Sequence, residues 1–216
     1  MCIFKNVHHL LYFFSYFCLQ NNQYHTAMKR IVLFLVTLGI CCWAGAQEHL
    51  KFKNIPIDGP KKAFVEALCE NEFHLVNDGE FGAALRGRFT GKTVDVFVMP
   101  TSEGTTSRVA VNYPSPDNWG NLRLDFYTLL RSLSFKYGEP VELTQEFQLP
   151  FSDGDGRELE ALRRGRARWY ARFVSPEGTI HLMIANNPMT QQPAINLLYE
   201  DAINCRRQDE LNSQDL

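Results

Sequence analysis

The strongest constraint on this sequence is an alternation of apolar and polar residues that occurs twice along the chain. A period of two is typical of a strand with one buried face. Turn residues separate the runs, so each set predicts three strands in an antiparallel meander. The first set is Phe81, Ala83, Leu85 and Phe89, then Val94, Val96 and Val98, then Val109, Val111 and Tyr113. The second is Trp169, Ala171 and Phe173, then Ile180, Leu182 and Ile184, then Ile195, Leu197 and Tyr199.

Each meander follows a helical pattern. Phe64, Val65, Leu68 and Cys69 fall on one face of a first helix that opens near Pro60. A second apolar stripe runs from Leu122 to Leu133 and ends before Gly138 and Pro140. We therefore expect an α+β fold, an antiparallel sheet of two three-stranded meanders with the helices packed on one face. The meanders form one continuous sheet or two abutting ones. A short helix is expected near 157–164, and the polar tail after Cys205 is expected to fray.

The two patterns together indicate an internal duplication, with half-repeats at 58–113 and 117–199 and an insertion at 141–166. Arg88-Phe89 precedes a glycine turn and an alternating strand, and Arg172-Phe173 does the same. Tyr113 and Tyr199 then end the two units at matching places. The alternative is that any two meanders would share this much alternation.

The N-terminus has the form of an export signal. In 28–46 a basic start is followed by an apolar run and by Ala44-Gly45-Ala46, the order of a secretory signal peptide. The run is too short to span a bilayer, and a buried core helix is the alternative. We expect 1–27 to be an upstream extension from a misassigned start, with a longer membrane anchor as the other interpretation. Residues 47–216 then form a single domain.

Removal of 1–46 changes the charge and the cysteine content. The prefix contains three basic residues and no acidic one, so 19 basic and 24 acidic residues remain. This acidic balance argues against nucleic acid as a partner. No transmembrane span remains after cleavage, and we expect a periplasmic or extracellular location. Cys69 and Cys205 are the two cysteines left, and they either pair as a disulfide or stay as free thiols.

The chain resembles a group of exported α+β proteins of Gram-negative gut bacteria whose function is uncharacterised. The likeness runs from the Leu50-Lys51-Phe52 strand, through the Gly91 hairpin, to the helix end at Lys136-Tyr137-Gly138-Glu139-Pro140. In layout alone, the repeated helix and antiparallel strands are also similar to the beta-lactamase inhibitor proteins. Neither resemblance implies a role for any particular residue, because fold likeness is a weak guide to function.

No motif of catalysis, metal binding or cofactor binding survives inspection. An EF-hand loop beginning at Asp153 fails at Arg157, Glu158 and Arg164. A looser calcium site is weighed against a solvated turn that caps a short helix; its acidic residues would be Asp153, Asp155, Glu158 and Glu160. We therefore expect no catalytic residues, no metal and no cofactor. A basic cluster is interpreted as a solvated face with local ion pairs; its members are Arg157, Arg163, Arg164, Arg166, Arg168 and Arg172.

The outer face of the strands is the candidate binding surface. Alternation places an arginine-rich and aromatic set there: Arg86, Arg88, Phe97, Met99, Arg108, Asn112, Arg168, Tyr170, Arg172, His181, Met183 and Leu198. Arginine with aromatic residues and methionine is enriched at protein interfaces. We expect Phe97, Tyr170, Arg172 and His181 to be the partner-binding residues. The alternative is that a loop or the C-terminal segment covers this face.

The function predicted from these observations is an exported, non-enzymatic binding or inhibitor-like module. It would dock an envelope or extracellular protein or peptide on its open sheet face. An envelope assembly or structural factor is the second interpretation, and a hydrolase acting on glycan or peptide is the third. The sequence identifies no partner and leaves enzymatic activity open.

The cleavage site gives a first test. If a signal peptidase cuts after Ala46, the mature protein begins at Gln47. N-terminal mass spectrometry of the exported protein should find this end. Detection of residues from 1–27 or 28–46 on the mature chain would contradict the assignment.

Overall fold

A computed structural model describes residues 47–116, 118–187 and 190–214. The unit described below is Gln47–Leu216. The predicted signal peptide and upstream extension lie outside the described residues. In the described part, no helix is long and apolar enough to cross a membrane.

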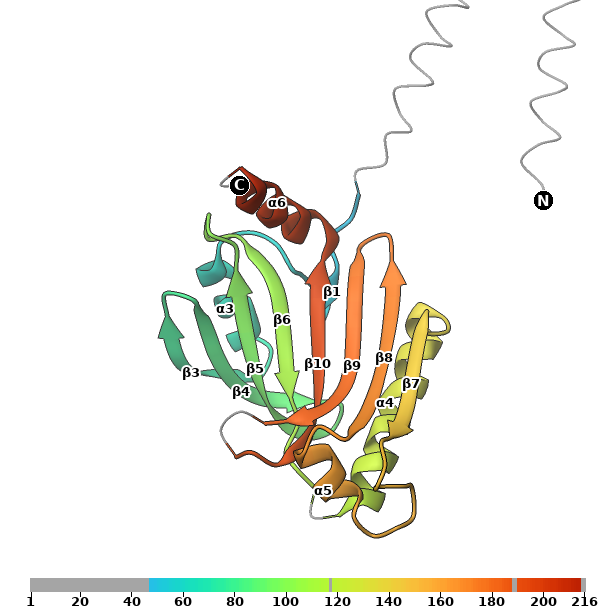
Figure 1. The fold of residues 1–216 in the computed structure, drawn as a ribbon. Coiled ribbons are helices and arrows are strands. Elements are labelled where there is room, and N and C mark those ends of the chain that lie inside the picture. The colour runs from blue at the N-terminus through green and yellow to red at the C-terminus, as the bar shows by residue number, and fades with distance from the viewer. Residues whose placement is uncertain (1–46, 117, 188–189, 215–216) are drawn as a thin grey trace, which may run out of the picture. The chain divides into compact units, whose positions relative to one another are not determined.

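The domain is α+β and is built on one continuous antiparallel sheet of eight strands (Figure 1). The strand order is β3-β4-β5-β6-β10-β9-β8-β7. The first four are β3 (Phe73–Gly79), β4 (Gly82–Phe89), β5 (Lys92–Pro100) and β6 (Thr106–Asn112). The other four are β7 (Glu142–Phe147), β8 (Ala167–Ser175), β9 (Gly178–Asn186) and β10 (Pro193–Asp201). A separate hairpin pairs β1 (Lys51–Phe52) with β2 (Ile55–Pro56).

Each half of the sheet has four strands, so the prediction of two three-stranded meanders was wrong by one strand in each. The missed strands, β3 and β7, are the two edges of the sheet. In β3 the register shifts between Leu75 and Asn77, which breaks the alternation. In β7 half of the side chains are exposed at the edge and none is fully buried, so few of them need to be apolar. The two halves join through β6 and β10, where Val109 lies opposite Tyr199 and Val111 opposite Leu197.

One face of the sheet is buried beneath two helices, α3 (Lys61–Cys69) and α4 (Trp119–Tyr137), as Figure 1 shows. The strand residues predicted to face the helices are all fully buried except Phe89, which is partly buried; they are Leu85, Val94, Val96, Val109, Val111, Phe173, Ile180, Leu182, Ile195 and Leu197. Burial of this apolar area is the main favourable term in the stability of the domain. The alternation in the sequence therefore identified the buried face correctly.

The helices confirm part of the prediction. Asn118 caps α4 by accepting a hydrogen bond from the Asn121 N–H, and Gly138 ends it with a positive φ of 84°. Leu122, Phe126, Leu129 and Leu133 form its buried stripe. The short α5 (Glu158–Arg163) also lies where a helix was expected. However, α5 and α6 (Ala202–Ser213) lie at the two ends of the sheet rather than on the helix-covered face (Figure 1).

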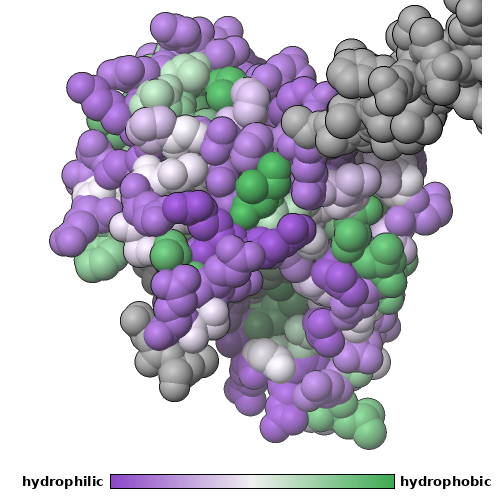
Figure 2. All heavy atoms as spheres, turned by 90° about the horizontal axis from the view of Figure 1, so that it is seen from above, coloured by the Kyte–Doolittle hydropathy of each residue, from purple (hydrophilic) through white to green (hydrophobic). Residues whose placement is uncertain are grey.

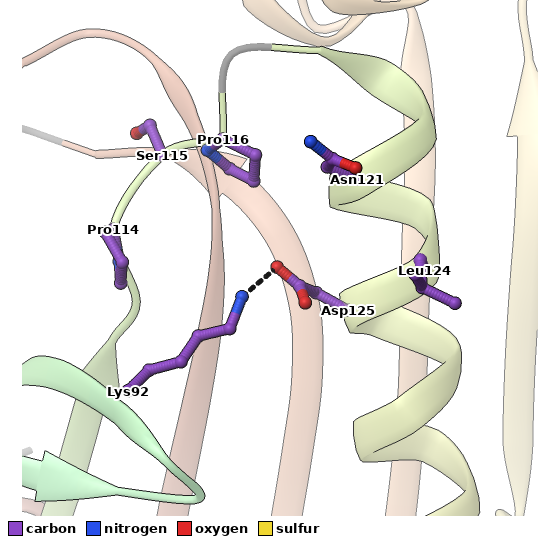
Figure 3. A pocket seen from close by; sticks show the side chains of 7 residues that line it. All are labelled: Lys92, Pro114, Ser115, Pro116, Asn121, Leu124 and Asp125. Carbon is purple, nitrogen blue, oxygen red and sulfur yellow. Dashed lines mark hydrogen bonds and ion pairs between the residues drawn. The ribbon is translucent and has the colours of Figure 1, made fainter.

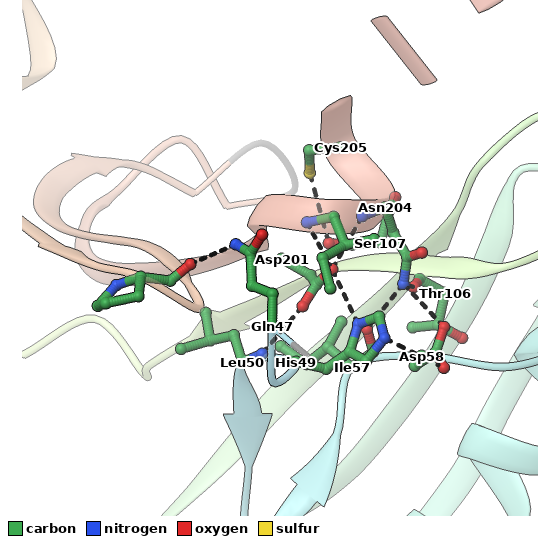
Figure 4. A network of polar contacts seen from close by, with 12 residues as sticks. Gln47, His49, Leu50, Ile57, Asp58, Thr106, Ser107, Asp201, Asn204 and Cys205 are labelled. Carbon is green, nitrogen blue, oxygen red and sulfur yellow. Dashed lines mark hydrogen bonds and ion pairs between the residues drawn. The ribbon is translucent and has the colours of Figure 1, made fainter. Parts of the chain in front are cut away.

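The C-terminal tail forms α6 and does not fray as predicted, because a buried aspartate holds its first turn. Asp201 is fully buried and accepts hydrogen bonds from the backbone N–H groups of Ile203 and Asn204. The same carboxylate accepts from the Leu50 N–H at 2.9 Å and contacts His49 Nδ1 at 3.1 Å. Asp201 therefore joins the start of the domain to its last helix (Figure 4).

Asn204 completes this junction. Its buried side-chain amide donates to Ile57 O, Thr106 O and Asp58 Oδ1 at 3.0–3.1 Å. The three acceptors come from the segment after the β1–β2 hairpin and from the start of β6, so one side chain holds three segments together (Figure 4). The pKa of Asp58 is lowered overall: burial raises it, but the hydrogen bonds from Asn204 and the Gly59 N–H and the nearby His49 outweigh burial.

Loss of the Asn204 side-chain amide should destabilise the fold. We expect Asn204→Ala to lower the free energy of unfolding by about 2–4 kcal/mol, because two buried carbonyls lose a donor. The matched control is Asn212→Ala on the exposed side of the same helix, which should change it by less than about 0.5 kcal/mol. Urea unfolding of both variants measures the difference. Equal stabilities would contradict the role of Asn204.

Candidate functional site

The face of the sheet opposite α3 and α4 is open. Each of the twelve residues predicted for it is exposed or partly exposed, whereas the alternate residues on the same strands are buried. Neither a loop nor α6 therefore buries them in the described structure. Seen from above, the α6 end of the molecule is mainly hydrophilic, with apolar side chains in small separate patches (Figure 2).

Register brings the predicted partner-binding residues into one row across the sheet. Phe97 on β5 lies opposite Ala110 on β6, Ala110 opposite Leu198 on β10, Leu198 opposite His181 on β9, and His181 opposite Arg172 on β8. With strands about 4.8 Å apart, Phe97 lies roughly 14 Å from His181. Tyr170, Arg172 and His181 are thus neighbours, while Phe97 belongs to the far end of the same row.

A chain of hydrogen bonds crosses four strands on this face. Tyr170 OH lies 2.7 Å from His181 Nδ1, and His181 Nε2 lies 3.0 Å from Glu200 Oε2. Arg108 Nε donates to the other oxygen of Glu200 at 2.7 Å. Because a carboxylate only accepts, the neutral imidazole carries its hydrogen on Nε2, and the tyrosine hydroxyl donates to Nδ1.

Burial and neighbouring groups shift the pKa values of Glu200 and Tyr170. The hydrogen bond from His181 lowers the pKa of Glu200, with Arg108 adding to the effect and burial opposing it. Burial raises the pKa of Tyr170, and the Glu142 carboxylate adds to this against the lowering effect of Arg172 and Arg168. Tyr170 therefore remains a neutral phenol at physiological pH. This suits a fixed hydrogen-bonding group better than a nucleophile.

The arginines beside Tyr170 share one carboxylate. Arg168 donates to Glu142 Oε1 at 3.0 Å and Arg172 to Glu142 Oε2 at 3.4 Å. The Arg168 guanidinium also lies 5.1 Å from the centre of the Tyr170 ring. On the other half of the face Arg86 makes two hydrogen bonds to Asp95, at 2.7 and 3.2 Å. The guanidinium groups are thus already oriented by cross-strand partners.

The arginines of the predicted basic cluster also contact neighbouring side chains. Arg157 and Arg164 both pair with Glu160, at 3.2 and 2.8 Å. Arg163 and Arg166 contact the side-chain amides of Gln192 and Gln148. Local pairing on an exposed face agrees with the interpretation made from the sequence.

Sequence reasoning missed two acidic residues of the site, Glu142 and Glu200. Glu200 continues the alternation of β10 on the same side as Leu198, and that position was the signal available. Glu142 had no such signal, because β7 itself was not predicted. The contacts of both residues depend on register between strands, which alternation alone does not give.

A pocket of about 280 Å³ lies elsewhere, between the start of β5 and α4 (Figure 3). Its lining residues are Lys92, Pro114, Ser115, Pro116, Asn121, Leu124 and Asp125. Lys92 and Asp125 form an ion pair across it. The lining contains no histidine or cysteine and none of the residues around Tyr170, so this pocket and the open face are separate features.

The acidic residues considered as calcium ligands instead contact other groups of the chain. Asp155 accepts from the backbone N–H groups of Ser152 and Arg157, which lower its pKa. Glu158 is buried and accepts from the Gly154 N–H, while Asp153 contacts Trp119 and Arg123. Among the described residues, no three histidine, cysteine or acidic side chains are placed to hold a metal ion.

Cys69 and Cys205, the two cysteines within the described residues, are free thiols, so the predicted disulfide between them is not formed in this structure. Cys69 is exposed at the end of α3, so its expected place on the buried stripe of that helix was wrong. Cys205 lies in the first turn of α6, where its Sγ donates to Ser107 O at 3.5 Å. Burial raises the pKa of the Cys205 thiol to about 11.

The lowered pKa of Glu200 gives a test by pH. A carboxyl whose folded pKa lies below its ordinary value of 4.5 stabilises the fold above that value, and this contribution is lost as pH falls through the folded pKa. Glu200→Gln should therefore be less stable than wild type at pH 7, and the difference should shrink below about pH 4.5. Urea unfolding between pH 7 and 3 measures it, with Glu146→Gln on exposed β7 as control. A difference that does not vary with pH would refute the assignment.

No family model, curated protein or solved structure matches this chain. The two resemblances drawn from the sequence therefore stay predictions.

Proposed function

We propose that this chain is an exported binding module that docks a protein on the open face of its sheet. The observation that carries the proposal is an apolar centre bordered by guanidinium groups that are already oriented. Phe97 and Leu198 flank Ala110 in one cross-strand row, and the paired Arg86, Arg108 and Arg172 surround them. An apolar core with a polar rim is the usual anatomy of a protein interface.

The size of the face supports a folded partner. Eight strands about 4.8 Å apart and roughly 25–30 Å long present on the order of 900 Å². A standard protein interface buries about 800 Å² on each side. A single extended peptide would cover only a small part of such a face.

The fixed side chains support binding at low entropic cost. Tyr170 and His181 are held by hydrogen bonds, and Arg168 and Arg172 by Glu142. Immobilising a rotamer-rich side chain at an interface costs about 0.5–1.5 kcal/mol, and side chains that are already ordered avoid part of this cost. The neutral Tyr170 and the separate location of the pocket at Lys92 favour this interpretation over a hydrolase.

Truncation of the fixed residues should weaken binding. We expect Tyr170→Ala and Arg172→Ala each to reduce capture of the partner from an envelope extract by about 1–2 kcal/mol, with nearly unchanged melting temperature. Phe135→Ala and Arg131→Ala are matched controls, since both residues are exposed on α4, away from this face. Affinity capture with quantitative mass spectrometry, alongside thermal melts, gives both measurements.

Two outcomes would reject the proposal. If the changes at Tyr170 and Arg172 mainly lower the melting temperature, these residues serve the fold rather than a partner. If they change neither capture nor stability, any partner binds elsewhere on the molecule.

A further inference from the structure

The edge strand β7 has the properties of a strand that accepts another strand. It is last in the sheet order, and no strand of the described residues pairs with its outer side. Residues 142–147 pair with β8 in unbroken register and contain no proline. Natural edges are usually blunted by bulges, proline or charge. The other edge, β3, has such a bulge between Leu75 and Asn77, whereas β7 has none.

The outward backbone groups of β7 follow from its register. Gln148 N–H donates to Arg166 O, and residues 142, 144 and 146 continue the same series of pairs with β8. In an antiparallel ladder alternate residues bond to the neighbour, and the residues between them point their N–H and C=O groups to the other side. The outward groups of β7 are therefore those of Leu143, Gln145 and Phe147.

The side chains along this edge differ between the two faces. Leu143, on the helix side, is 50% exposed, and Val141, just before the strand, is 58% exposed, although both are apolar. Tyr127 of α4 donates to Gln145 Oε1 at 3.0 Å. On the open side the edge presents Glu142, Thr144 and Glu146, and within the described residues Glu146 forms no ion pair.

We propose that β7 binds an extended segment of another protein in which basic and apolar residues alternate. Its backbone would pair with Leu143 and Gln145, a lysine or arginine side chain would lie opposite Glu146, and its apolar side chains would cover Val141 and Leu143. Glu146 carries the charge preference, because Glu142 is already paired with Arg168 and Arg172. Opposite charges facing each other across two strands are stabilising, and like charges are destabilising. A second copy of this chain paired about Thr144 would set Glu142 opposite Glu146 twice, whereas pairing about Gln145 avoids this, so self-association is one outcome that the test below distinguishes.

This inference is independent of the proposed function, since it uses the edge and not the open face. The probe is a capped peptide of roughly seven residues in which valine alternates with lysine, threonine and lysine. Its comparison peptides carry glutamate for lysine, or N-methyl groups on the backbone amides that would pair. Binding is followed by amide chemical shifts of the purified ¹⁵N-labelled protein. We expect shifts at Leu143 and Gln145, and affinity at least about fivefold higher for the lysine peptide than for the glutamate peptide.

Reversal of one edge charge sharpens the test. Glu146→Lys should reverse the preference between the two peptides, while Glu80→Lys, at the exposed turn of the other edge, should leave it unchanged. Glu146→Gln should abolish most of the preference without a new charge. Four results would each overturn the proposal. The first two are equal affinity for the lysine and glutamate peptides and unaltered binding of the N-methylated peptide. The others are chemical-shift changes confined to the open face and a dimer of the protein alone in sedimentation. Tyr170→Ala should not affect peptide binding, so failure here is distinct from failure of the open-face proposal.

Discussion

The buried carboxylate of Asp201 is the interaction on which the closure of this fold depends. It has no exposure to solvent, and a buried carboxylate is tolerated only when several donors satisfy it. Those donors come from Leu50 and His49 at the start of the domain and from the first turn of α6. One charged group thus determines where the first strand begins and where the last strand gives way to a helix. Asn204, one turn further along, connects the same helix to the start of β6.

The central pairing of β6 with β10 then divides the molecule into two comparable halves and two different faces. Each half contributes one long element to the helix layer and four strands to the sheet. The helix-covered face is mainly apolar and supplies the core, and the opposite face carries Tyr170, His181 and the paired arginines. Because the sheet is continuous across β6 and β10, Arg108 donates a hydrogen bond of 2.7 Å to Glu200, although the two residues are 92 positions apart in the sequence. The open face is therefore a product of both halves.

The sequence was sufficient to predict those strands in which burial of one face imposes an alternation of apolar and polar residues. It was insufficient for elements that lack this alternation. Val94, Val96 and Val98 are buried on one face, so their alternation predicted β5 and its orientation. The edge strands β3 and β7 escaped prediction, since a bulge disrupts one and exposure removes the apolar pattern from the other. Helix α6 is polar and buries only Asn204, so it depends on capping by Asp201 rather than on an apolar stripe. Within the candidate site, alternation placed Tyr170 and His181 on the open face, but their contacts with Glu200 and Glu142 needed the register between strands.

The position of β10 at the centre of the sheet has a consequence for the order of events during synthesis. Until β10 emerges, β6 is an unpaired edge, and the apolar side chains of Val109 and Val111 lack their neighbours Tyr199 and Leu197. Pairings between distant segments form late, because the entropy of closing a long loop must be overcome first. The domain thus cannot complete its core before nearly the whole chain has left the ribosome. A nascent chain of this design therefore stays incompletely folded until β10 has been made.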